Sequence, residues 1–182
     1  MPKSKSAYSI PGKVGKMDTH IFVVWVDNEA GVLARVVGLF SGRGYNIESL
    51  AVAEVDATKN ISRITIVTTG TPQVIDQIKL QLKKLIPVHK VADFKREDKK
   101  VIFKEMALLK ITGKKKKIEK CLKACKRFNP VILDKTKQSV VIQITALRRE
   151  IDKMSKKLKP LGLISTSRTG AIAMTRGAEV FK

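Results

Sequence analysis

The order of apolar and polar positions along the first half of the chain predicts alternating strands and helices. Residues 21–26 form a short apolar run rich in β-branched side chains, which is typical of a strand in the middle of a sheet. From Val32 the apolar positions follow the spacing of one helical face, and glycines 42 and 44 end that helix. The pattern then predicts strands at 47–55 and 61–67, a helix over 74–85 and a strand at 88–94. This order is a βαββαβ unit.

The second half of the chain repeats the same order after six consecutive charged residues at 95–100, which are too polar to bury. The pattern predicts strands at 106–111, 131–133, 140–144 and 163–167, with helices over 118–125 and 147–158. We therefore expect a disordered basic leader at 1–17, a first domain at 18–95, a charged linker at 96–103 and a second domain at 104–182.

Two successive βαββαβ units predict an α+β protein with two tandem ferredoxin-like domains. Each helix has to return the chain to the sheet by a right-handed crossover, which gives a four-stranded antiparallel sheet with both helices on one face. In the first unit the strand positions on the other face are also apolar. We therefore expect that face, or an edge of the sheet, to be buried against a partner chain, and hence a homodimer.

The charge of the chain is strongly positive and unevenly placed. The formal net charge is +21, and residues 101–182 carry 21 basic and six acidic side chains, against 16 and ten in residues 1–100. Such an excess can indicate nucleic-acid binding. The basic runs at 114–117 and 153–159 are mostly lysine and contain no aromatic side chains that could stack on bases. A solvated surface is the better interpretation, and nucleic-acid binding is a weaker alternative.

The sequence offers little that could carry out chemistry. Cys121 and Cys125 lie four residues apart in a predicted helix without a second pair of ligands, so we expect buried free thiols rather than a metal or redox site. There is no phosphate-binding loop, no GxGxxG turn and no convincing pair of nucleophile and base. No apolar run approaches the roughly 18 residues that a membrane helix needs. We expect no catalytic residue, no metal site and no membrane span.

The segment from Asp27 to Leu33 combines polar side chains, a glycine and the start of a helix. Free backbone N–H groups at a helix N-terminus attract anions such as a carboxylate, and Gly31 lets a ligand approach the backbone closely. Asn28 could bind either charged end of an amino acid, or it could simply cap the helix. The residues alone leave both interpretations open.

Several segments resemble a known family. Residues 27–33 resemble the start of an ACT domain, a ligand-binding module of amino-acid metabolism, and residues 35–50 are similar to acetolactate synthase small subunits. Further similar segments occur in the family's order at 61–66, 77–85, 104–111 and 168–170. The chain departs from the family in its very basic second domain and at residues 129–130.

The resemblance implies a regulatory subunit without an active site of its own. The thiamine diphosphate, magnesium and flavin of acetolactate synthase would lie on a separate catalytic large subunit, and this chain would hold no cofactor. It would activate that subunit and mediate feedback inhibition by valine, or bind another branched-chain amino acid. The location would be cytoplasmic, with the plastid stroma not excluded.

In ACT dimers of this kind the effector lies between two chains. The resemblance therefore implies that Asn28, Gly31, Val32 and Leu33 of one chain face Asn46 and Ile47 of the other. A stand-alone ACT-type amino-acid sensor is the main alternative, and a basic nucleic-acid-binding protein of ferredoxin-like fold is a weaker one.

Overall fold

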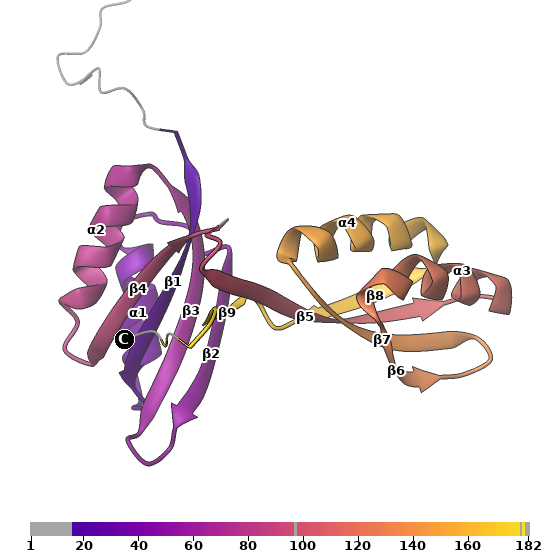
Figure 1. Cartoon of the computed structure of the whole chain (residues 1–182), viewed down its shortest axis with the longest axis horizontal. Helices are drawn as coiled ribbons and strands as arrows, with labels where there is room; N and C mark the ends of the chain where they lie inside the picture. Colours follow the sequence, from indigo (N-terminus) through magenta and orange to yellow (C-terminus); the bar gives the residue numbers. More distant parts are fainter. Residues whose placement is uncertain (1–15, 97, 179, 181–182) are drawn as a thin grey trace, which may run out of the picture.

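The computed structural model describes residues 16–96, 98–178 and 180, and it contains two domains joined by one long strand, β5 (Figure 1). Each domain has a four-stranded antiparallel sheet with two helices, so the predicted tandem ferredoxin-like α+β fold is confirmed. The predicted leader lies outside the described residues, apart from its last two positions. Within the described residues, no helix is both long and apolar enough to cross a bilayer.

The first domain follows the predicted order of elements. It consists of β1 (Asp18–Asp27), α1 (Val32–Ser41), β2 (Ser49–Asp56), β3 (Ile61–Gly70), α2 (Pro72–Lys83) and β4 (Val88–Lys95). The strands lie in the order β2-β3-β1-β4, so β1 and β3 are central and β2 is an edge. Apolar residues of α1 and α2 share one core with Phe22, Val24 and Ile66 of the central strands. Both helices therefore cover the same face of the sheet.

The second domain repeats this arrangement. It consists of β5 (Val101–Thr112), α3 (Lys115–Cys125), β6 (Val131–Lys135), β7 (Ser139–Ala146), α4 (Arg148–Leu158) and β8 (Leu163–Arg168), with strand order β6-β7-β5-β8. Single 3-10 turns at Lys126–Phe128 and Lys159–Leu161 end the two helices. Cys121 and Cys125 are buried free thiols in its core, as predicted. Burial raises the pKa of the Cys125 thiol to about 11.

One part of the fold was not predicted. β5 begins at Val101, inside the segment expected to be a linker, and its first four residues pair with a ninth strand, β9 (Ile172–Thr175). Val101 and Phe103 are buried although they directly follow a charged run. We call this two-stranded unit, residues 101–104 with 171–175, the ribbon.

The ribbon packs on the helix-free face of the first sheet. Val101, Phe103, Ala171 and Ala173 form a third apolar cluster with side chains of the first sheet that include Val23. Arg63 of β3 also donates a hydrogen bond to the carbonyl oxygen of Ala173. The chain itself therefore covers part of the face for which a partner chain was expected. The edge strand β2 is one of the places left for such a partner.

Candidate functional site

The loop between β1 and α1 is held by backbone hydrogen bonds from the ends of neighbouring strands. The amide of Asp27 donates to the carbonyl oxygen of Pro87 at 2.9 Å, and the amide of Asn28 donates to that of Asn60 at 2.7 Å. The Asn28 side-chain oxygen accepts a hydrogen bond from the Ser62 hydroxyl at 3.0 Å. Asn28 is therefore tied to β3, and the interpretation of Asn28 as the cap of α1 is wrong.

Gly31 is the residue that caps α1, and it has the left-handed conformation with φ of 84°. No side chain accepts a hydrogen bond from this helix end, and the first turn contains no acidic residue. The first backbone N–H groups of a helix have no partner within the helix, and they carry the positive end of its dipole. A Cβ at Gly31 would meet no atom within 4 Å, so the space beside the Gly31 Cα is open. The loop can accept a carboxylate.

Val32 and Leu33 differ in what they offer a ligand. The Val32 side chain is 3% exposed and lies in the core of the first domain, and its amide donates to the carbonyl oxygen of Glu29 at 3.3 Å. The Leu33 side chain is 41% exposed. An apolar contact from this end of α1 therefore has to come from Leu33 rather than from Val32.

Asn46 and Ile47 lie in the loop between α1 and β2. The carbonyl oxygen of Asn46 accepts a hydrogen bond from the Thr68 hydroxyl at 2.7 Å, and Ile47 is half-buried against the core. Gly31 is at the other end of α1, and ten residues of helix extend about 15 Å. One chain therefore does not bring the two predicted groups of site residues together. We call each group a half-site of the predicted effector site.

The edge strand β2 runs from one of these half-sites and has no partner strand on its outer side within the described chain. Its Val52 and Val55 side chains are 45% and 51% exposed. An unpaired strand edge with apolar side chains readily pairs with another strand. The first domain thus has an edge at which a further strand could pair.

Sequence reasoning missed the contacts that tie the α1–β2 loop to the second domain. The Arg148 guanidinium donates to the carbonyl oxygen of Glu48 at 3.2 Å and lies 3.8 Å from its carboxylate. The amide of Ala171 donates to the Ser49 hydroxyl at 3.2 Å. These partners are 100 and 122 residues apart, so no local pattern could have indicated them. The residues next to Asn46 and Ile47 are therefore in direct contact with the other domain.

Two models of protein families match the chain and together account for both domains. An "AHAS small subunit-like ACT domain" matches residues 22–90, and "Small subunit of acetolactate synthase" matches residues 104–177. The chain belongs to the acetolactate synthase small-subunit family.

Individual members of the acetolactate synthase small-subunit family resemble the whole chain. The acetolactate synthase small subunit of Aquifex aeolicus is 38% identical over 89% of this chain and 83% of its own length. The subunit of Buchnera aphidicola is also 38% identical, over 87% and 98%. The crystal structure of the Thermotoga maritima small subunit covers 88% of this chain and 99% of its own, at 30% identity and a TM-score of 0.79. The resemblance expected from the sequence is confirmed.

Proposed function

We propose that this chain is a regulatory subunit that activates the catalytic large subunit of an acetolactate synthase and makes it sensitive to valine. The observation that carries the proposal is the match of both halves of the chain to small-subunit families. Among the described residues there is also no group of three metal-ligating side chains. On this proposal the thiamine diphosphate, magnesium and flavin belong to the large subunit, and this chain contributes no cofactor.

The effector site in this proposal is shared by two chains that pair along β2. A two-fold axis at this edge sets the two β2 strands antiparallel, and the two α1 helices also become antiparallel. The N-terminal end of one α1 then lies beside the C-terminal end of the other. This arrangement brings the Gly31 half-site of one chain toward the Asn46 half-site of its partner.

The chemistry of the two half-sites suits a branched-chain amino acid. The N–H groups of Gly31 and Leu33 favour the carboxylate, whereas the amide of Val32 already donates to the carbonyl oxygen of Glu29 at 3.3 Å. The polar Asn28 and Asn46 can hydrogen-bond the charged ends of the ligand. Leu33 and Ile47 offer apolar surface to the side chain of the effector. Valine is the effector we propose, and leucine and isoleucine are the closest competitors in chemistry.

Inhibition requires only that valine binds one arrangement of the complex better than the other. A coupling free energy of about 1–3 kcal/mol is common in allosteric proteins. Because the ligand would bridge two chains, it would also stabilise the dimer by mass action. The effect of valine should therefore appear both in the dimerisation of this chain and in the activity of the large subunit.

Calorimetry with valine, leucine and isoleucine tests the site, using the wild-type chain and Asn28→Ala. We expect valine to bind the wild type and the variant to lose affinity by about tenfold or more, as expected for removal of one hydrogen bond to a charged group. Gln138→Ala is the control, because this exposed amide lies in the turn between β6 and β7 of the second domain. Equal valine affinity in all three proteins would remove Asn28 from the site.

Reconstitution with a purified large subunit tests the function itself. We expect the wild-type chain to raise acetolactate formation, and valine to reverse that increase. Asn28→Ala should still activate, but it should need a higher valine concentration for inhibition. A large subunit whose activity is the same with and without the chain would contradict the proposal.

A further inference from the structure

A cavity of about 470 Å³ lies at the junction of the two domains, and its lining includes Glu48, the residue that follows Ile47 of one half-site. Its described lining comes from β1, β3 and β5, the α1–β2 loop and the start of α4. Described residues after β4 and at 171 and 176 complete it. Volumes of roughly 300–1,000 Å³ are usual for small-molecule sites. We call it the junction cavity.

Among the described residues, the junction cavity is lined by six basic side chains and three acidic ones. The basic residues are Arg96, Lys99, Lys104, Arg148, Arg149 and Arg176. The acidic residues are Glu48, Asp98 and Glu105. The cavity therefore has more positive than negative charge, although it includes carboxylates.

The three carboxylates already have other partners. Glu105 is 3% exposed, and both of its oxygens accept hydrogen bonds at 2.7 Å from Arg168, which does not line the cavity. Asp98 accepts a hydrogen bond from the amide of Lys100 at 2.8 Å. Glu48 accepts one from the Thr69 hydroxyl. Arg168 therefore neutralises Glu105, whereas Asp98 and Glu48 keep their negative charge. The six basic side chains still outnumber these two carboxylates.

Most of the basic side chains lack a carboxylate partner. Among the described residues, Arg96, Lys99, Lys104 and Arg176 form no ion pair, and Arg148 reaches the carboxylate of Glu48 only at 3.8 Å. Arg148 and Arg149 also occupy the first turn of α4, at the positive end of the helix dipole. Acidic side chains are the favourable ones there, and Glu150 of the same turn accepts a hydrogen bond from the amide of Leu147 at 3.2 Å. A bound anion would offset the positive charge of the four side chains that form no ion pair among the described residues.

We propose that the junction cavity binds a small phosphate-bearing anion that bridges the two domains. Guanidinium groups suit this ligand, because their planar donors match the oxygens of a phosphate in pairs. Residues of both domains line the cavity, so the bound anion stabilises their relative orientation. The inference does not depend on the valine site, because the two sites share none of their proposed ligand residues.

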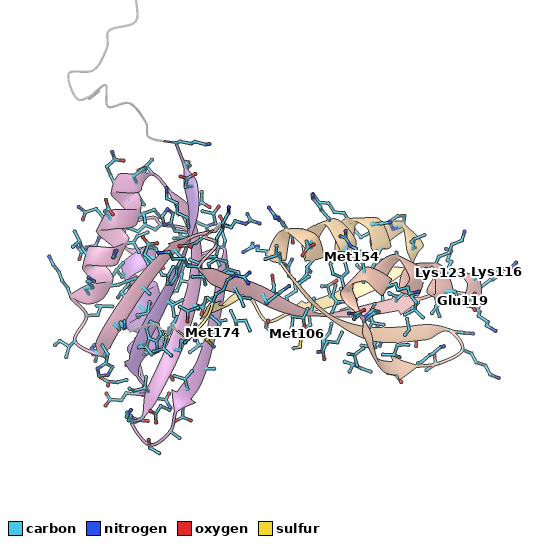
Figure 2. The ribbon with its side chains drawn as sticks, viewed as in Figure 1. Met106, Lys116, Glu119, Lys123, Met154 and Met174 are labelled. Carbon is cyan, nitrogen blue, oxygen red and sulfur yellow. The ribbon has the colours of Figure 1, made fainter. Side chains whose placement is uncertain are left out.

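Lysines on the surface of α3 provide matched control variants, which separate the effect of losing one net charge from the effect of losing a side chain in the cavity. Figure 2 shows Lys116 and Lys123 on this helix at the end of the molecule farthest from the first domain. Neither residue lines the junction cavity, and both are exposed. Replacing one of them by glutamine removes the same charge as replacing a cavity arginine, but at a distance from the cavity.

The test is calorimetry of the full chain with pyrophosphate at a fixed ionic strength of about 0.15 M, where long-range attraction to the net charge is largely screened. The variants are Arg148→Gln, Arg176→Gln and the controls Lys116→Gln and Lys123→Gln. Arg176 is exposed and makes no ion pair among the described residues, so its variant keeps the test valid if Arg148→Gln folds poorly. Citrate serves as a second ligand of similar charge without phosphate.

We expect saturable pyrophosphate binding, with each arginine variant losing about tenfold in affinity, as for one charge-assisted pair. The lysine variants should bind like the wild type, and pyrophosphate should raise the unfolding temperature. The same loss in all four variants would instead reveal binding to the net charge and overturn the proposal. No saturable binding by the wild type would also overturn it, and citrate binding as tightly as pyrophosphate would overturn the assignment of a phosphate group.

Discussion

Two glycines show how differently a single residue can constrain this protein. Gly162 ends the turn before β8 with φ of 109°, and a Cβ there would lie 2.2 Å from the carbonyl oxygen of Thr112. Gly177 has φ of 70°, but a Cβ there would meet no atom within 4 Å. Both backbones are unfavourable for other residues, and only Gly162 also lacks the space. At position 162, therefore, both the positive φ and the lack of space require glycine.

Gly162→Ala should destabilise the second domain by about 2–4 kcal/mol, because positive φ and a steric clash add together. The clash would also break the hydrogen bond from the amide of Thr112 to the carbonyl oxygen of Gly162. Urea unfolding measures this loss in the free energy of unfolding. Gly177→Ala should lose only about 1 kcal/mol from the backbone alone. Similar losses in the two variants would show that the clash is relieved at little cost.

At the scale of elements, the proposed pairing along the edge strand β2 is what brings the half-sites of two chains together. Val52 is 45% exposed on this strand, while Ile164 is 61% exposed on β8, an edge of the second sheet. Both are β-branched side chains at strand edges. We assign only β2 to the dimer, so the two positions should respond differently to the same change.

Val52→Lys should shift the chain from dimer to monomer at micromolar concentration, because a charge on an edge strand opposes pairing with another strand. Size-exclusion chromatography with light scattering measures the mass directly. The same variant should lose valine affinity even though it changes no proposed ligand. Ile164→Lys is the control and should remain a dimer. A wild-type chain that is monomeric throughout would contradict the pairing along β2.

The elements also show what the sequence could and could not reveal. Helices and central strands were predictable because their apolar positions repeat locally. The start of β5 was missed because the charged residues 95–100 directly precede buried Val101. β9 was missed because it has only four residues and pairs with β5 about 70 positions earlier. The cap at Gly31 was missed because Asn28 looked like a capping residue, while its partner Ser62 is 34 residues away.

At the scale of the whole molecule, the ribbon determines whether the two domains behave as one unit. Phe103 on β5 is 9% exposed and belongs to the cluster between the ribbon and the first sheet. The next residue on one side, Ile102, is 36% exposed. Phe103 therefore packs between the ribbon and the first sheet, whereas its neighbour Ile102 does not belong to that cluster.

Phe103→Ala should lower the free energy of unfolding by about 3–5 kcal/mol, as is common for loss of a buried aromatic ring. We also expect one cooperative thermal transition to separate into two, because the domains lose much of their shared core. Scanning calorimetry resolves both effects. Ile102→Ala should change the unfolding much less and keep a single transition. Two transitions in the wild type would show that the ribbon does not couple the domains.

The continuity of β5 has a mechanical consequence. The strand has twelve residues, with its beginning packed on the first sheet and its remainder central in the second. It extends about 40 Å, so a tilt of about ten degrees at its beginning would displace its far end by roughly 7 Å. A hydrogen-bonded strand bends less easily than a loop. Small changes in the first domain would therefore be amplified into a swing of the lysine-rich helix α3.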